Sequence, residues 1–81
     1  VIIRTAPELS GISNAAADAE RALALDAGHP EGLLERGIVR RLKGDDDGAR
    51  RDWLKVLTIA PGTSAARAAQ ANLEKMDVKA P

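Results

Sequence analysis

The sequence repeats itself at an offset of 34 residues, and this periodicity limits the folds open to the chain. Residues 22–28, ALALDAG, align with residues 56–62, VLTIAPG. The same offset pairs Ala15 with Ala49. A period of 20–50 residues is typical of solenoids, in which a unit buries its apolar face by stacking on its neighbours. The chain is therefore expected to contain about two copies of one small unit.

Four segments rich in good helix formers and poor in β-branched residues lie between the prolines and glycines. Apolar residues recur in them three or four positions apart, as Leu34, Ile38 and Leu42 do. Ser13 or Asn14 is expected to cap the first helix, while Pro30 suits the first turn of the second. Thr63 or Ser64 is the candidate cap of the fourth helix. The predicted helices span residues 14–27, 30–43, 46–60 and 64–76, and their short turns indicate antiparallel neighbours.

The composition supports closely packed helices. Hydrophobic residues make up 44% of the chain, but sixteen of them are alanine and Trp53 is the one aromatic residue. Small side chains suit close helix packing, whereas sheets favour β-branched and aromatic residues. The sequence therefore predicts an all-α fold.

The charge balance excludes several classes of protein. Twelve basic residues match twelve acidic ones, which argues against a dedicated nucleic-acid binder and against attraction to an anionic membrane. The chain has no cysteine, so disulfides, thiolate metal sites and cysteine nucleophiles are excluded and the compartment stays undetermined. No apolar run approaches the roughly 20 residues of a membrane span.

Residues 30–63 resemble one complete tetratricopeptide repeat. The landmarks are small residues where two helices meet, a turn glycine, a bulky aromatic and a closing proline: Gly37, Gly44, Ala49, Trp53 and Pro61. The segment LLERG, residues 33–37, resembles a common bacterial variant of the first helix of a repeat. The resemblance implies antiparallel helix–turn–helix repeats that form part of a superhelix.

The repeat divides the chain into five parts. Residues 14–29 resemble the second helix of a preceding repeat, and residues 64–77 the first helix of a following one or a capping helix. Residues 1–13 are then an N-terminal extension or a degenerate repeat start, and residues 78–81 a tail. Because the sequence begins with Val1, it is expected to be a piece of a longer bacterial protein.

The run Asp45-Asp46-Asp47 looks most like a chemical site. A calcium loop of the EF-hand type needs ligands at alternate positions and a distal glutamate, neither of which is present. We expect one aspartate to cap the helix that follows, with Asp46 and Asp47 facing Arg50 and Arg51 one turn later. The sequence therefore predicts a helix start here rather than a metal or catalytic site.

No other segment predicts catalysis or a cofactor. The basic residues of the second and third helices are interleaved with acids, which indicates a solvated face laced with salt bridges rather than a nucleic-acid surface. His29, the only histidine, has no partner residue that would make it a metal ligand or a general base. We therefore expect a protein that is not an enzyme and has no metal and no cofactor.

The resemblance implies a concave groove lined by the first helix of each repeat. The residues it assigns to this groove are Glu31, Leu34, Ile38, Arg41, Ala68, Asn72 and Lys75. Such a groove suits a peptide with an apolar anchor and an acidic or carboxylate group. Alternatively, Leu34 and Ile38 are buried against a neighbouring helix or subunit.

Taken together, the sequence predicts a non-catalytic protein-interaction module that binds a peptide segment of a partner. The alternative is self-association, because two repeats are fewer than the three usually needed and would leave apolar edges exposed. A nucleic-acid-associated module is the third and weakest possibility.

Overall fold

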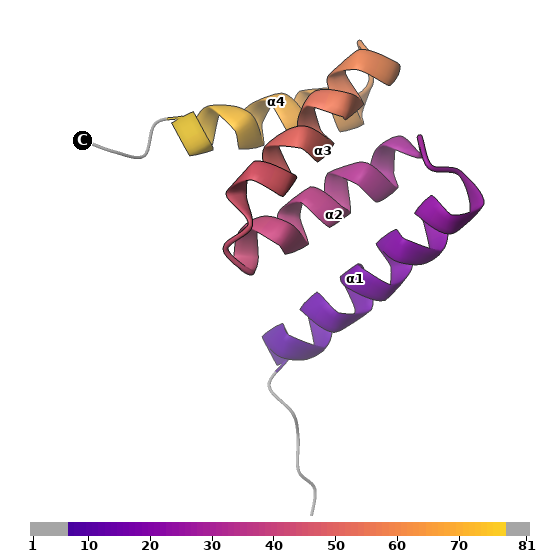
Figure 1. The fold of residues 1–81 in the computed structure, drawn as a ribbon, viewed down its shortest axis with the longest axis vertical. Helices are drawn as coiled ribbons and strands as arrows, with labels where there is room; N and C mark the ends of the chain where they lie inside the picture. The colour runs from indigo at the N-terminus through magenta and orange to yellow at the C-terminus, as the bar shows by residue number, and fades with distance from the viewer. Residues whose placement is uncertain (1–6, 78–81) are drawn as a thin grey trace, which may run out of the picture.

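The computed structural model describes residues 7–77, with side chains from Ala16 onward, and these residues form four α-helices without a strand. They are α1 (Pro7–Leu25), α2 (Pro30–Leu42), α3 (Asp46–Ile59) and α4 (Ser64–Asp77). Successive helices run antiparallel, with α2 between α1 and α3, and α4 packs against both α3 and α2 (Figure 1). The prediction of an all-α fold of helix–turn–helix repeats is confirmed.

Side-chain caps define where three of the helices begin. The His29 Nδ1 accepts the Gly32 backbone N–H at 2.9 Å at the start of α2, with Pro30 in its first turn. The Asp45 carboxylate accepts the Gly48 N–H at 2.9 Å at the start of α3. The Thr63 hydroxyl accepts the Ala66 N–H at 3.1 Å at the start of α4. Each cap satisfies a backbone donor that the helix itself cannot, which fixes the turns between the helices.

Two turns depend on glycine. Gly44, between α2 and α3, has a φ of +92°, and Gly62, between α3 and α4, has a φ of +81°. Residues with a side chain rarely adopt this left-handed conformation. These two positions therefore let each helix reverse direction within a few residues.

The predicted start of the first helix is wrong. The helix begins at Pro7, so Ser13 and Asn14 lie inside α1 instead of capping it. A proline is well accommodated in the first turn of a helix, and a glycine such as Gly11 costs only about 1 kcal/mol in its interior. The part of the predicted N-terminal extension before Pro7 lies outside the described residues, as does the predicted tail, residues 78–81.

The core lies where α2, α3 and α4 meet. Trp53 on α3 is 1% exposed and packs with the buried side chains of α2 and α4. Four buried alanines also line this interface: Ala49, Ala65, Ala66 and Ala69. A Cβ added at Gly37 of α2 would lie 2.3 Å from the Trp53 Nε1. The indole can therefore pack directly on the α2 backbone only because residue 37 has no side chain.

Candidate functional site

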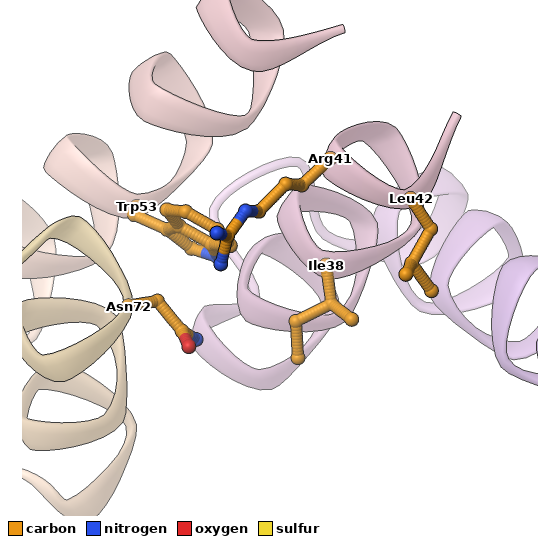
Figure 2. Close-up of a pocket in the computed structure, with 5 residues that line it drawn as sticks. All are labelled: Ile38, Arg41, Leu42, Trp53 and Asn72. Atoms are coloured by element: carbon orange, nitrogen blue, oxygen red, sulfur yellow. The ribbon is translucent and has the colours of Figure 1, made fainter. Parts of the chain in front are cut away.

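A pocket of about 370 Å³ lies between α2 and α4. Its walls are formed by Ile38, Arg41, Leu42, Trp53 and Asn72 (Figure 2). The residues come from three helices, because Trp53 of α3 reaches the space between α2 and α4. The pocket is open to solvent, so a partner could reach it without any helix moving.

The apolar surface of the pocket comes from α2. Ile38 and Leu42 are four positions apart, which places them on the same face of the helix. They are 38% and 62% exposed, so neither is covered by α4. Exposed aliphatic side chains in a concave site offer contact area that a bound side chain could remove from water.

The inner wall of the pocket is rigid. The Trp53 Nε1–H donates to the Leu34 carbonyl at 3.2 Å, which holds the indole against α2. The missing side chain at Gly37 lets the ring pack there. Since the indole cannot turn away without losing this hydrogen bond, the pocket is formed in the unbound protein.

Polar groups occupy the rim of the pocket. The Arg41 side chain extends from α2 toward Trp53, and Asn72 points into the space from α4 (Figure 2). Among the side chains of residues 16–77, no carboxylate pairs with Arg41. The pocket thus combines one uncompensated cation with an amide that can both donate and accept.

The structure brings three of the seven residues assigned to the groove into this pocket: Ile38, Arg41 and Asn72. Leu34 and Ala68 are half-buried, and Leu34 packs against the core. Glu31 and Lys75 are exposed but do not line the pocket. Leu34 and Ile38 were expected either to be exposed in the groove or to be buried. Leu34 is largely covered, whereas Ile38 is accessible.

Two lining residues were not assigned to the groove from sequence. Leu42 could have been found, because it lies one helical turn beyond Ile38 on the same face. Trp53 was identified from sequence only as a landmark of the repeat, and in the structure it is both buried and in contact with the pocket. A single sequence does not show that one edge of a core residue reaches a cavity.

The aspartate run begins α3, and only one of its members makes the expected contact. Asp45 caps the helix. The expected pairs of Asp46 with Arg50 and of Asp47 with Arg51 do not form, and Arg50 instead reaches the Asp77 carboxylate of α4 at 3.0 Å. The contact between helices replaces the one within the helix, and it ties the start of α3 to the end of α4.

A second charged cluster joins α2 to α3. Asp52 is 4% exposed and accepts two hydrogen bonds of 2.9 Å from Arg36, with Arg40 at 3.4 Å. The hydrogen bonds to Asp52 raise the pKa of Arg36, against the opposing effect of burial, and the charge of Glu20 raises it further. The stabilisation from this shift is present below the usual pKa of arginine and is lost only as the pH rises through the raised value.

The Asp52 cluster borders a smaller pocket of about 170 Å³ between α1 and α2. Its charged lining residues are Glu20, Arg36, Arg40 and Lys43. Because Asp52 already pairs with both arginines, this pocket has less uncompensated charge than its lining suggests. The cluster is therefore best described as a link between helices.

The described part of the chain has neither a membrane-spanning helix nor a cluster of metal-binding side chains. No helix between Pro7 and Asp77 is both long enough and apolar enough to cross a membrane. The same residues hold no group of three or more histidine, cysteine, aspartate or glutamate side chains that could bind a metal ion together.

Comparison with known proteins supports the resemblance to tetratricopeptide repeats. The chain is 48% identical over 46 residues to tetratricopeptide repeat protein 36 of Bos taurus. The match covers 52% of this chain and 24% of the bovine protein, so the chain spans about a quarter of the length of this relative. No family model matches the sequence. No solved structure matches it either.

Proposed function

We propose that this chain is a non-catalytic protein-interaction module of the tetratricopeptide type, which binds a peptide segment of a partner in the groove between α2 and α4. The observation that carries the proposal is the open pocket with Ile38 and Leu42 exposed in it. The similarity to a tetratricopeptide repeat protein supports a role in protein interaction in general terms.

The size and polarity of the pocket suit a peptide. A volume of about 370 Å³ can hold one or two side chains rather than a folded domain. The Asn72 amide can donate to a peptide carbonyl and accept from a peptide N–H. An apolar wall together with a few oriented polar groups is the usual composition of a binding pocket.

The repeat organisation remains part of this proposal. Residues 30–63 form the complete repeat, residues 14–29 the second helix of a partial one, and residues 64–77 a following or capping helix. The outward face of α4 presents polar side chains, Arg67, Gln70 and Glu74, which supports a capping role. The bacterial origin inferred from the LLERG segment stays a prediction, because the relative is bovine.

An affinity-capture experiment tests the groove. The immobilised wild-type chain is compared with Ile38→Asp in the groove and with Leu54→Asp, which introduces the same change at an exposed leucine of α3 outside the pocket. Proteins captured by the wild-type chain and by Leu54→Asp should be lost with Ile38→Asp, provided that all three have the same helical circular dichroism. Equal capture by all three would reject the groove as the binding site.

Self-association is the second candidate function. The observation in its favour is Leu25, which is 86% exposed at the end of α1. Against it, the predicted apolar edge is absent from the outward face of α4, where exposed side chains are mainly polar. We expect a monomer in sedimentation at micromolar concentration, and a dimer that Leu25→Ser dissociates would favour self-association instead.

We also propose that nucleic acid is not a partner. The charges of the whole chain balance, and Arg36, Arg40 and Arg50 each pair with an aspartate. Binding to single-stranded or duplex DNA should therefore be undetectable near physiological salt. Measurable binding there that weakens as the salt concentration is raised would contradict this proposal, because it would indicate contacts with phosphates.

A further inference from the structure

We infer that the ligand of the α2–α4 groove is a continuous peptide segment that carries an acidic side chain close to a large aliphatic one. The acidic side chain would pair with Arg41, and the aliphatic side chain would pack on Ile38 and Leu42. This inference rests on the proposed function and adds the chemistry of the partner to it.

Charge is the first reason. Among the residues whose side chains the structure describes, 16–77, Arg41 is the only charged one that lines the pocket. The neighbouring arginines Arg36 and Arg40 are paired with Asp52, whereas no carboxylate pairs with Arg41 among the side chains of residues 16–77. A bound carboxylate would therefore meet a cation that does not have to leave another partner first.

The position of Arg41 is the second reason. Its side chain extends toward Trp53 and Asn72, across the pocket, and not away from the protein (Figure 2). Trp53, Ile38 and Leu42 surround this space with apolar surface. Salt bridges in fully exposed positions contribute little, but a ligand that covers Arg41 here also removes water from around the ion pair.

The charge along α2 fixes which end of the groove receives the acid. Glu31 and Glu35 lie in the first half of the helix, and neither lines the pocket. Arg41 lies roughly 9 Å further along the helix axis than Glu35, at 1.5 Å per residue. An acidic group near the start of α2 would be repelled, so the carboxylate belongs at the Arg41 end.

The lining of the pocket places the aliphatic residue of the partner beside its acidic residue. Ile38 and Leu42 are one turn apart on the same face of α2, and both lie on one side of the Arg41 guanidinium, which extends toward Trp53 (Figure 2). A segment whose acidic side chain pairs with Arg41 can therefore pack one neighbouring aliphatic side chain on both Ile38 and Leu42.

Selection from peptide libraries tests the inference on the chain as it exists. One library presents random decamers fused to carrier protein at both ends, and a second presents them with a free carboxyl terminus. The baits are the wild-type chain, Arg41→Glu, Ile38→Asp, and Arg51→Glu as a matched control. Arg51 is exposed on α3 and does not line the pocket, so the control makes the same charge change elsewhere. Enriched peptides are then synthesised, and the fluorescence of the single tryptophan, Trp53, measures their affinity.

We expect the wild-type chain to enrich, from the doubly fused library, decamers with Asp or Glu within a few residues of Leu, Ile or Met. Loss of the charge-assisted pair in Arg41→Glu should weaken these peptides about tenfold or more. Replacing their acidic residue by Lys should restore binding to Arg41→Glu. The Arg51→Glu control should bind like the wild-type chain.

The possible failures are distinguishable. If the wild-type chain enriches no peptide from either library, or if Ile38→Asp retains all of them, the proposed function itself fails. If peptides depend on Ile38 but lack an acidic residue or bind Arg41→Glu equally well, the groove stands and the inference about Arg41 is overturned. Enrichment from the free-carboxyl library alone would overturn the choice of a side-chain carboxylate.

Discussion

Helix α2 meets α3 and α4 in opposite ways. Toward α3 the contact is closed, because Gly37 admits the Trp53 indole and Asp52 binds the arginines of α2. Toward α4 the contact is open, and a pocket of about 370 Å³ separates the exposed Ile38 from Asn72. Successive residues of a helix point about 100° apart, so Gly37 and Ile38 can belong to different surfaces. Substitutions on the α3 side of α2 should therefore affect stability most, while the side facing α4 carries the exposed surface on which the proposed peptide would bind.

Removal of the indole is expected to have the largest effect on stability. Trp53→Ala deletes the largest fully buried side chain and should cost about 3–5 kcal/mol. A domain of this size has a free energy of unfolding on the order of 5–10 kcal/mol, so the variant should lose between about a third and all of its stability. Thermal unfolding followed by circular dichroism measures the loss. A loss below about 1 kcal/mol would contradict the central role of Trp53 in packing α2 against α3.

The substitution Gly37→Ala tests the same contact between α2 and Trp53 by adding one methyl group to α2. In Gly37→Ala the new Cβ would lie 2.3 Å from the Trp53 Nε1, so either the indole or α2 must shift. Overpacking of this kind typically costs about 1–3 kcal/mol, and loss of the Trp53–Leu34 hydrogen bond adds to it. Gly28→Ala is the matched control, because its Cβ would meet Ile59 at an ordinary 3.6 Å. Equal melting temperatures for the two variants would show that Trp53 does not need the gap at Gly37.

The Asp52 cluster was not predicted from sequence. Asp52 is 16 residues from Arg36 and 12 from Arg40, and no local rule connects residues so far apart. The repeat does not help, because Asp18, the equivalent of Asp52, is exposed on α1 and lies near Arg21 of its own helix. The same residue type at the same repeat position is buried in one unit and solvated in the other, since only Asp52 has arginines of α2 beside it.

Neutralisation of this buried acid should have an intermediate effect. Asp52→Asn keeps the shape of the side chain but removes the counter-charge of Arg36 and leaves Arg40 only its longer contact of 4.0 Å with Asp45. Both arginines are about one-third exposed and can turn toward water, so the expected loss is about 1–3 kcal/mol. Glu35→Gln, which removes a charge from an exposed position of α2, is the control. Urea unfolding should give a lower midpoint for Asp52→Asn alone, and an unchanged midpoint would mean that the cluster contributes nothing to stability.

Helix limits could be predicted where the signals are chemical and local. Pro30, the Asp45 cap, the Thr63 cap and the Pro61-Gly62 stop place the limits of α2, α3 and α4 within one residue of the predicted ones. The start of α1 was missed because Pro7 and Gly11 were treated as breakers. The rule that accommodates Pro30 in a first turn also accommodates Pro7.

The candidate site could be predicted only in part, because a helix face is easier to infer than what covers it. Spacing on α2 groups Ile38 with Arg41, and both residues line the pocket. It does not show that Leu34 turns into the core or that Lys75 remains outside the pocket. Those outcomes depend on how α4 crosses α2, and the packing of Trp53 and the alanines of α4 determines this crossing.

Truncation of the exposed leucine at the open contact should have the smallest effect on stability. Leu42 is 62% exposed and makes little contact with the core, so Leu42→Ser should change the free energy of unfolding by no more than about 0.5 kcal/mol. For a domain of this size that corresponds to a shift in Tm of roughly 2–4 °C. The same variant should weaken any peptide that packs on Ile38 and Leu42 several-fold, because a buried aliphatic contact is lost. A variant that melts much earlier than the wild-type chain would mean that the two sides of α2 are not independent. One that keeps both its stability and its affinity would place the peptide nearer to Asn72.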